Sequence, residues 1–317
     1  MLAAIDVRNR TITVGIKGPQ IDEEQDRAHN APCTRDSLWL AIRRFGATTF
    51  RSSDEYAMLL RQMLFELGLY PEMGSIQGQG PALPGGVASW NVWISSVVPA
   101  MTPTICAATF DVFGVEPRLV GPGTKTGIKI RTDLPGEVGS DLVCAAVAGR
   151  KRVKGPFLVV DFGVAIALSA VNAAGEFLGA AFAPGVETQA ESLRQQAAQL
   201  YEVRLDFPDH AIGRCTAEST RAGILLGTVG MVRELIRSMK SELAQGESPS
   251  IDLESIPVLG SGDFIGKEIL RRLGYETFVP CLVLDGLATI AQRASSIAEK
   301  TFERTLPLRD NLKPEKP

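Results

Sequence analysis

Two segments about half a chain apart share one design, in which an apolar strand ends in an aspartate and turns back into a second strand. The first copy begins at Leu2 and contains Asp6, and the second begins at Phe157 and contains Asp161. Short apolar runs followed by a turn are typical of buried strands. Two copies predict two similar domains, with Asp6 and Asp161 facing each other across one cleft. The alternative is that two α/β strands end in aspartate by chance.

The length and charge of the chain limit the partners that can be expected. The chain has 317 residues, of which 45% are hydrophobic and 22% charged. At roughly 100–200 residues per domain, this length predicts two domains, with enough apolar material for a sizeable core. Lys and Arg number 33, Asp and Glu 36, and the net charge is −3. This balance gives no general attraction to nucleic acid or to an anionic membrane, so neither partner is predicted.

Histidine and cysteine usage excludes several kinds of site. The only histidines are His29 and His210, which rules out an HExxH zinc motif and argues against a histidine-dependent catalytic triad. Five cysteines occur without any CxxC pair, so neither a disulfide framework nor a structural zinc site is predicted. The chain starts without the long apolar region of a signal peptide. Its most apolar stretch, Phe157–Pro184, is interrupted by Asp161 and Glu176, which argues against a membrane span. We therefore expect a reducing, cytoplasmic environment.

Local patterns predict a mixed α/β protein. Strands are expected at Leu2–Val7, Thr11–Lys17, Asn91–Val98, Phe157–Val160, Ala165–Val171 and Pro257–Leu259. Helices are expected at Ser53–Leu67, from Thr102 as N-cap followed by Pro103, from the region of Asp141 to Ala148, from Thr216 as N-cap to Leu243, and from Gly262 to Leu273. Gln77–Gly86 is predicted to be a surface loop, and Arg304–Pro317 a disordered tail.

A set of short motifs carries a family resemblance. In chain order they are Asp6-Val-x-Asn9, Ser52-x-Asp-Glu-Tyr56, Ser95-Ser-Val-Val-Pro99, Val120-Gly-Pro-Gly-x-x-Thr-Gly127, Glu137-Val-Gly-x-Asp141, Val160-Asp161-Phe-Gly163, Ala183-Pro-Gly185, Ile212-Gly-Arg-x-Thr216-x-Glu218 and Leu282-x-Leu-x-Gly-Leu287. Each motif alone is weak. Together, in this order and at these spacings, they resemble the type III pantothenate kinases over about residues 1–295.

The resemblance implies a fold, a reaction and a set of ligands. The fold would be two ribonuclease H-like domains of the sugar kinase and actin superfamily, at residues 1–120 and 121–303, followed by the tail at 304–317. The protein would be a homodimer with its active site near the dimer interface. The implied reaction converts ATP and pantothenate to ADP and 4′-phosphopantothenate, the first step of coenzyme A biosynthesis. It would require Mg²⁺ and a monovalent cation, K⁺ or NH₄⁺.

The resemblance also implies roles for individual residues. Asp141 matches the catalytic base, Asp161 the ligand of the monovalent cation, and Asp6 a carboxylate that faces Mg²⁺ and phosphate. The other positions that match ATP-binding residues are Asn9, Gly163, Gly260 and Gly262, and those that match pantothenate-binding residues are Gly139, Ser140, Asp141 and Thr216. Purely structural explanations remain open. Asp6 and Asp161 could bond to nearby backbone, Asp141 could favour the first turn of a helix, and Thr216 could act only as an N-cap.

The chain departs from the family pattern at several of these positions. Arg8 and Arg10 replace a glycine and a threonine of the first turn, and Val164 replaces a threonine that contacts ATP. Leu142 replaces an arginine beside the base, and Thr132 replaces an aromatic residue. Gly260-Ser-Gly262 stands where the family has Thr-Gly-Gly. These changes remove hydroxyl and cationic groups, and Arg8 would be strained if the turn required a positive φ.

The two arginines leave three arrangements open. They could bind phosphate directly, since guanidinium suits it well. They could instead pair with Asp6 and Asp161 and fill the nucleotide site, or they could point to solvent. Three functions follow: a kinase relative with lost or strongly reduced activity, an active diverged kinase that uses Arg8 or Arg10 for phosphate, and a non-catalytic dimer that senses a ligand or binds a regulatory partner.

Overall fold

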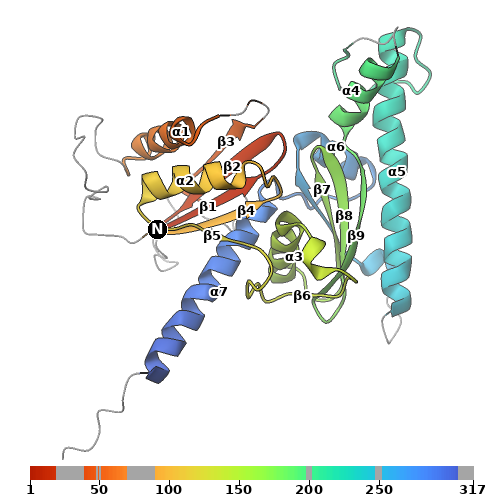
Figure 1. The fold of residues 1–317 in the computed structure, drawn as a ribbon. Helices are drawn as coiled ribbons and strands as arrows, with labels where there is room; N and C mark the ends of the chain where they lie inside the picture. Colours follow the sequence, from red (N-terminus) through yellow and green to blue (C-terminus); the bar gives the residue numbers. More distant parts are fainter. Residues whose placement is uncertain are drawn as a thin grey trace, which may run out of the picture.

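The computed structural model describes residues 1–18, 39–47, 49, 51–69, 90–197, 202–246 and 252–305, with side chains up to residue 297. The described residues form two five-stranded sheets and the helices that cover them (Figure 1). The first sheet has the order β3-β2-β1-β4-β5 and the second the order β10-β7-β8-β9-β6. In the first sheet the strands are β1 (Leu2–Val7), β2 (Thr11–Lys17), β3 (Ala41–Gly46), β4 (Asn91–Ser96) and β5 (Arg118–Leu119). In the second they are β6 (Lys129–Ile130), β7 (Phe157–Phe162), β8 (Ala165–Val171), β9 (Glu176–Pro184) and β10 (Val258–Gly262).

The two sheets repeat one topology. β1, β2 and β3 form an antiparallel meander with β4 parallel to β1, and β7, β8 and β9 form the same meander with β10 parallel to β7. Asp6 pairs with Ser95 of the parallel neighbour, and Asp161 pairs with Ser261 at the equivalent place. The predicted strand–aspartate–hairpin repeat is therefore confirmed, as is the fold class of two ribonuclease H-like halves.

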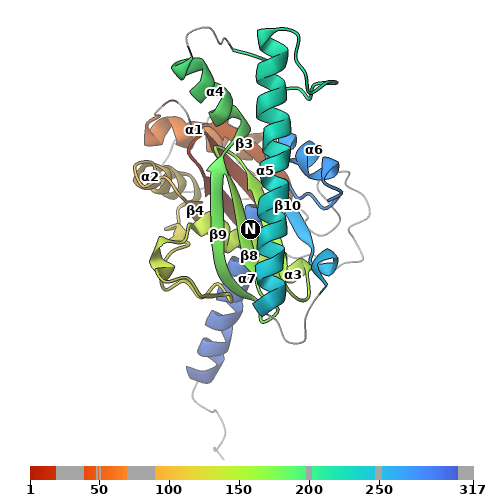
Figure 2. The same ribbon diagram turned by 90° about the vertical axis from the view of Figure 1, so that its right-hand side faces the viewer.

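Helices separate and cover the sheets in layers. The helices are α1 (Ser53–Glu66), α2 (Thr102–Phe113), α3 (Ser140–Arg152), α4 (Val186–Gln196), α5 (Thr216–Gly246), α6 (Phe264–Arg272) and α7 (Leu282–Thr305), and single 3₁₀ turns occur at Pro135–Glu137 and Leu253–Ser255. α1 and α2 pack on the outer face of the first sheet, and α5 and α6 on the outer face of the second (Figures 1 and 2). α3 and α7 lie between the two sheets.

The alternation of side chains along β1 and β7 places both aspartates on the inner layer. Ile5 and Val7 face α1 and α2, whereas Ala4 belongs to the core around α3 and α7. In β7, Val160 belongs to the outer core and Val159 to the inner one. Successive side chains of a strand point to opposite faces of the sheet. Asp6 therefore lies on the same face as Ala4, and Asp161 on the same face as Val159. Period-two patterning thus directs both carboxylates inward, toward the start of α3.

Asp285 of α7 ties the inner layer together. Its Oδ1 accepts a hydrogen bond of 2.9 Å from Trp39 Nε1, and its Oδ2 accepts one of 2.6 Å from Arg152 Nη2 at the end of α3. The carboxylate is 7% exposed. Next to it, Gly286 lets α7 approach α3 closely, since a Cβ there would lie 1.9 Å from the Cys144 carbonyl oxygen. The glycine of the Leu282–Leu287 motif is therefore required by helix packing.

Most predicted elements are confirmed, with small corrections at their ends. β4 ends at Ser96 rather than Val98, and Met101 rather than Thr102 occupies the N-cap position of α2. The Thr102 hydroxyl is used differently, since it donates to the Val98 carbonyl and bonds to the Ser96 hydroxyl. α5 includes Thr216 in its first turn, so Thr216 is not the residue that precedes the helix.

Two elements extend further along the chain than predicted. β10 continues through Gly260 to Gly262, beyond its predicted end, and α7 continues to Thr305, past the predicted start of the tail. The predicted loop 77–86 and residues 306–317 lie outside the described residues. Among the helices that are described, none combines the length and apolar character needed to cross a bilayer.

Candidate functional site

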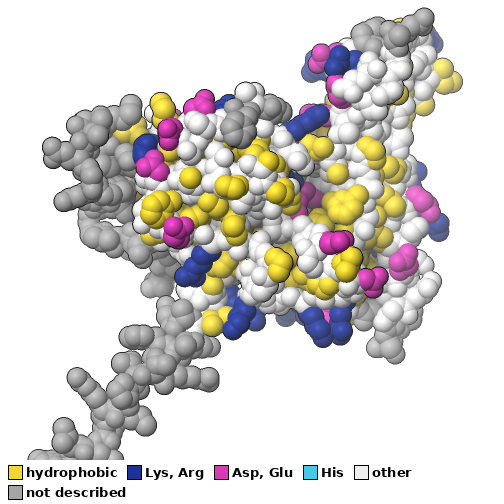
Figure 3. All heavy atoms as spheres, in the orientation of Figure 1, with side chains coloured by type: hydrophobic (Ala, Val, Ile, Leu, Met, Phe, Trp, Pro, Cys, Tyr) yellow, Lys and Arg dark blue, Asp and Glu magenta, His cyan; other side chains and the backbone are white. Residues whose placement is uncertain are grey.

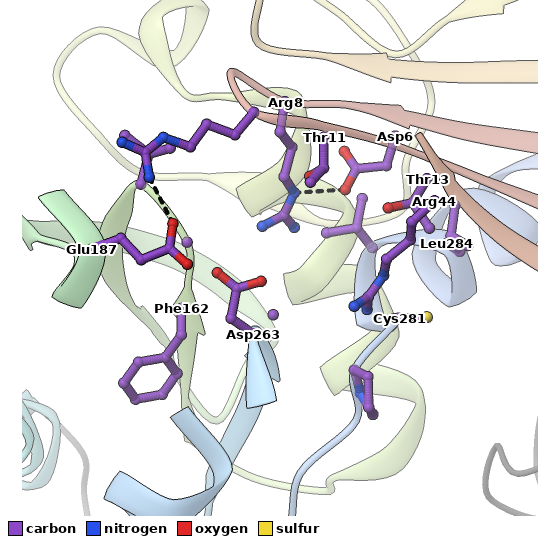
Figure 4. A pocket seen from close by; sticks show the side chains of 16 residues that line it. Asp6, Arg8, Thr11, Thr13, Arg44, Phe162, Glu187, Asp263, Cys281 and Leu284 are labelled. Atoms are coloured by element: carbon purple, nitrogen blue, oxygen red, sulfur yellow. Dashed lines mark hydrogen bonds and ion pairs between the residues drawn. The ribbon is translucent and has the colours of Figure 1, made fainter. Parts of the chain in front are cut away.

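The carboxylates at the ends of β1 and β7 meet at one guanidinium. Arg8 Nε donates a hydrogen bond of 2.6 Å to Asp6 Oδ2, and Arg8 Nη1 donates one of 2.5 Å to Asp161 Oδ2. Asp6 is 4% exposed and Asp161 is 6% exposed. Figure 4 shows Arg8 lying beside Asp6 within the pocket at these strand ends. For Arg8, the second of the three arrangements is therefore the observed one, and the two aspartates face each other as predicted.

The turn that carries Arg8 is unstrained. No described residue other than glycine has a positive φ, so the strain considered for Arg8 does not exist. The backbone N–H of Arg8 instead donates a hydrogen bond of 2.9 Å to the Thr11 carbonyl and closes the β1–β2 turn. The arginine thus fits this hairpin with an ordinary backbone conformation, and only its side chain changes the site.

The pKa values in this cluster follow from burial and from the neighbouring charges. Burial raises the pKa of Asp6 to about 6, with Asp141 and Asp161 adding to the increase and Arg8 opposing it. Burial alone would lower the pKa of Arg8, but the charges of Asp161, Asp6 and Asp141 raise it well above its ordinary value. Three carboxyl groups and one guanidinium therefore share this space.

Asp141 joins the same cluster through the start of α3. Gly139 occupies the N-cap position of this helix, and Asp141 Oδ1 accepts a 2.8 Å hydrogen bond from the Leu142 N–H. Burial raises the pKa of Asp141; Arg8 counteracts this effect and Asp161 adds to it. The Ser140 hydroxyl bonds to the Ser95 hydroxyl at 2.9 Å and to the Ser96 carbonyl at 3.2 Å, which docks α3 on the end of β4. The structure therefore brings Asp6, Asp141 and Asp161 together.

A pocket of about 160 Å³ opens next to the cluster. Of the predicted ATP-site positions, Asp6, Arg8, Arg10, Gly163, Val164 and Gly262 line it. Other residues of this lining were not predicted from the sequence, notably Thr11, Thr13, Arg44, Glu187, Asp263 and Cys281. Figure 4 shows Arg8 and Arg44 reaching into the pocket from one side, and Glu187 and Asp263 from the other. Among these residues, only Asp263 could have been predicted from the sequence, because it directly follows the Gly260–Gly262 motif.

The walls of this pocket are partly backbone. Gly262 has a φ of +92°, and a Cβ there would lie 2.0 Å from the Phe162 carbonyl oxygen, so this position requires glycine. Val164 lines the pocket without a hydroxyl, and its carbonyl accepts hydrogen bonds from the Gly185 N–H at 2.8 Å and from the Thr188 hydroxyl at 2.7 Å. The backbone of the second hairpin therefore anchors the start of α4.

Arg10 does not pair with either aspartate. Its Nη1 donates a hydrogen bond of 2.6 Å to Glu187 Oε2 at the start of α4, and both side chains are more than a third exposed. Arg44 of β3 makes no side-chain hydrogen bond or ion pair within the part of the chain that the structure describes. Its charge lowers the pKa of Asp263, although burial, the largest influence, keeps that pKa above its ordinary value. Of the three arrangements left open by the sequence, pairing with Asp6 and Asp161 is thus observed for Arg8 and not for Arg10.

The remaining predicted positions lie outside this pocket. Asn9 is exposed in the β1–β2 turn, and Gly260 packs against Leu270 and Phe278. Leu142 is 6% exposed and belongs to the inner core, so its side chain packs with apolar neighbours. Thr132 is half-buried, and its hydroxyl has no hydrogen-bond partner. Thr216 is exposed at the outer end of α5, next to α4 and away from α3 (Figure 1). A single chain therefore does not bring Thr216 and Asp141 together.

The carboxylates do not fit the cations that the resemblance implies. One oxygen each of Asp6 and Asp161 is engaged by Arg8, and their other oxygens, both named Oδ1, are buried without a hydrogen-bond partner. Within the described residues, no group of three or more His, Cys, Asp or Glu side chains is arranged to hold a metal ion. The guanidinium of Arg8 already occupies the space between the two carboxylates that are expected to hold a cation.

Comparisons with known proteins agree with the motifs. The family described as type III pantothenate kinase matches residues 4–238. A type III pantothenate kinase of Moorella thermoacetica is 32% identical over 295 residues, covering 92% of this chain and 99% of that protein. One of Geobacter sulfurreducens is 36% identical over 293 residues, with the same coverage of both chains. A solved structure described as a conserved putative Baf family transcriptional activator from Campylobacter jejuni superposes with a TM-score of 0.51 at 11% identity. It covers 93% of this chain and 99% of that one, and it supports the fold alone. Together with the repeated sheets and the shared motifs, these matches show that the chain belongs to the type III pantothenate kinase family.

Proposed function

We propose that this protein is a type III pantothenate kinase relative of coenzyme A biosynthesis whose phosphoryl transfer is lost or strongly reduced. The observation that carries the proposal is the ion pairing of Arg8 with both Asp6 and Asp161. Phosphoryl transfer requires the protein to position the phosphates and to neutralise their charge with cations. In this chain the carboxylates expected to hold those cations are committed to an internal partner.

The other substitutions act in the same direction. Val164 lines the pocket where the family has a hydroxyl, and Leu142 lies in the core where the family has a cation. Loss of one preorganised contact to transition-state charge costs about 2.7–4 kcal/mol, or about 10²–10³ in rate. The losses need not add, because residues of one site act as a unit. Asp141 is the residue expected to act as the base. A base alone does not preserve the reaction when the contacts to phosphate are lost.

Pantothenate phosphorylation is expected to be at least about a hundredfold slower than in an ordinary member of the family. The measurement is a coupled ADP-release assay with ATP, pantothenate, Mg²⁺ and high K⁺ or NH₄⁺. The Geobacter sulfurreducens relative, assayed in parallel, serves as the control. A turnover of about 1 s⁻¹ or more, within the usual enzyme range, would contradict the proposal.

Nucleotide binding separates the inactive from the rewired alternative. The double variant Arg8→Gly with Arg10→Thr frees both carboxylates and returns one hydroxyl to the turn. We expect it to bind ATP–Mg²⁺ more tightly than the wild type in calorimetric titration, because nucleotide no longer has to break the Arg8 pairs. Arg10→Thr alone is the matched control, since Arg10 pairs only with exposed Glu187. Tighter binding by the wild type would favour the alternative in which the arginines hold phosphate.

We also propose a homodimer that includes α5 in its interface. Gly223 and Gly227 lie one turn apart on this helix, are exposed, and have no atom within 4 Å of an added Cβ. They are therefore not packed against another described part of the same subunit. Hydrophobic side chains are visible on the surface near β9 (Figure 3), and Phe182 of that strand is 67% exposed. A dimer would also explain how Thr216 could serve a site whose other residues lie elsewhere in the chain.

The dimer is expected to persist at micromolar concentration. Multi-angle light scattering should give a mass of about twice 34.0 kDa for the wild type. Gly227→Gln is expected to shift the protein toward monomer, because a long side chain would separate the two backbones. An exposed substitution on another face, such as Arg61→Gln on α1, should leave the mass unchanged. A stable wild-type monomer would contradict the proposal.

Domain division and location complete the proposal. We propose a boundary near residue 120, since β5 ends at Leu119 in the first sheet and β6 belongs to the second. α7 then returns to pack against the first sheet, so the two halves share one inner core.

We propose a cytoplasmic protein, and the absence of disulfides at Cys106, Cys144 and Cys215 is consistent with that setting.

A further inference from the structure

The side chain of Arg8 joins the two sheets by an ion pair. Its side chain leaves the β1–β2 turn of the first sheet and reaches Asp161, 153 residues away, at the end of β7 in the second. The same guanidinium bonds to Asp6 of its own strand. The side chain of Arg8 is 19% exposed and those of the two aspartates are 6% and 8% exposed, so little water reaches the cluster.

This cluster needs a positive charge to remain closed. Asp6, Asp161 and Asp141 bring three carboxylates into one buried space, where like charges repel and desolvation is unfavourable. A planar guanidinium suits this position because its Nε and Nη groups can donate to two different carboxylates at once. While the carboxyl groups are ionised, this side chain or a bound cation supplies that charge; the alternative is protonation of a carboxyl group.

We propose that Arg8 is a resident cation, which stands in for the metal ion and the monovalent cation expected at these two carboxylates. The closed cleft is therefore independent of Mg²⁺, K⁺ and NH₄⁺, and removal of Arg8 creates a site for a small cation between Asp6 and Asp161. The proposal rests on the geometry of the cluster and does not require that kinase activity be lost. An active enzyme with a cation-independent fold would contradict the proposed function and leave this inference intact.

The carboxylate oxygens without hydrogen-bond partners support the proposal of a cation site that Arg8 now occupies. Asp6 Oδ1 and Asp161 Oδ1 are buried and have no hydrogen-bond partner, and both belong to carboxylates that face the same guanidinium. Once Arg8 is truncated, the Oδ2 atoms that it engages also lose their partner, and a small cation can bind between the two carboxylates. Arg10 does not reach this space in the structure, since it is paired with Glu187 on the far side of the pocket.

The test measures thermal unfolding of the full chain at constant ionic strength in NaCl, KCl or NH₄Cl, each with and without MgCl₂. The wild-type melting temperature is expected to vary by less than about 1 °C among these salts. Arg8→Gly is expected to melt lower in NaCl and to recover at least about 3 °C with K⁺, NH₄⁺, Mg²⁺ or low millimolar guanidinium, because a ligand that binds only the folded state stabilises it. Arg10→Gly, the matched control, should show no cation-dependent recovery.

Two results would overturn the inference. One is a wild-type melting temperature that rises with K⁺ or Mg²⁺ as much as that of Arg8→Gly does. The other is a folded Arg8→Gly protein that responds to none of these cations. If Arg8→Gly does not fold, Arg8→Lys keeps the charge and is expected to be as insensitive to the salts as the wild type. A rise of about 3 °C or more for Arg8→Lys with K⁺ or Mg²⁺ would then count against the inference.

Discussion

Replacement of Arg8 by alanine is expected to lower the free energy of unfolding by about 3–5 kcal/mol, because it leaves buried carboxylates without their partner. The bonds that are lost are the 2.6 Å contact to Asp6 Oδ2 and the 2.5 Å contact to Asp161 Oδ2. Urea denaturation in a sodium buffer, at one fixed protein concentration, measures the change. The fixed concentration matters because the stability of a dimer depends on it.

Arg10→Ala provides the matched control for this experiment. Arg10 also forms a 2.6 Å ion pair, but its side chain is 38% exposed and that of Glu187 is 66% exposed. Exposed pairs contribute about 0–1 kcal/mol, so this variant should change little. Equal effects of the two substitutions would mean that Arg8 does not stabilise the cluster. Loss of stability in Arg8→Ala that disappears in an Asp6→Asn, Asp161→Asn background would assign it to these carboxylates.

Asp285→Ala is expected to have a similarly large effect on the inner layer, about 3–5 kcal/mol. The substitution leaves the guanidinium of Arg152 without its 2.6 Å partner and the indole N–H of Trp39 without its 2.9 Å acceptor. Both groups are largely removed from water, since the Arg152 side chain is 16% exposed and Trp39 is 5% exposed. Chemical denaturation followed by tryptophan fluorescence would report the loss, because Trp39 lies at the affected contact.

Glu268→Ala on α6 is the control for Asp285. Glu268 pairs with Arg271 and Arg272 at 2.9 and 3.0 Å on the exposed side of that helix, and its loss should cost less than about 1 kcal/mol. Asp285→Asn should fall between the two, since an amide oxygen can still accept from Trp39 but carries no charge for Arg152. If Asp285→Ala is as mild as Glu268→Ala, the buried network does not hold α3, α7 and Trp39 together.

Local patterns were sufficient to predict most elements. Ser52 and Glu55 form the capping box at the start of α1, which begins at the predicted residue. β1 and β2 occupy the predicted ranges because each is a short, largely apolar run, and both strands are buried along nearly their whole length. The ends of helices and strands were predicted less accurately than their presence. Thr102 reads as an N-cap from sequence, but its hydroxyl bonds to Val98 and Ser96, partners that depend on how β4 ends.

The candidate site could also be predicted only in part from the sequence. By itself, the sequence determined that Asp6 and Asp161 end equivalent strands, and strand periodicity then directs both to the inner face. Only the tertiary structure decided that Arg8 reaches both carboxylates, that Arg10 turns to Glu187, and that Leu142 enters the core. Arg8 and Arg10 are chemically identical and two positions apart, so no local rule separates them. Their partners are 153 and 177 residues away, and which one each side chain meets depends on how the two sheets pack across α3 and α7.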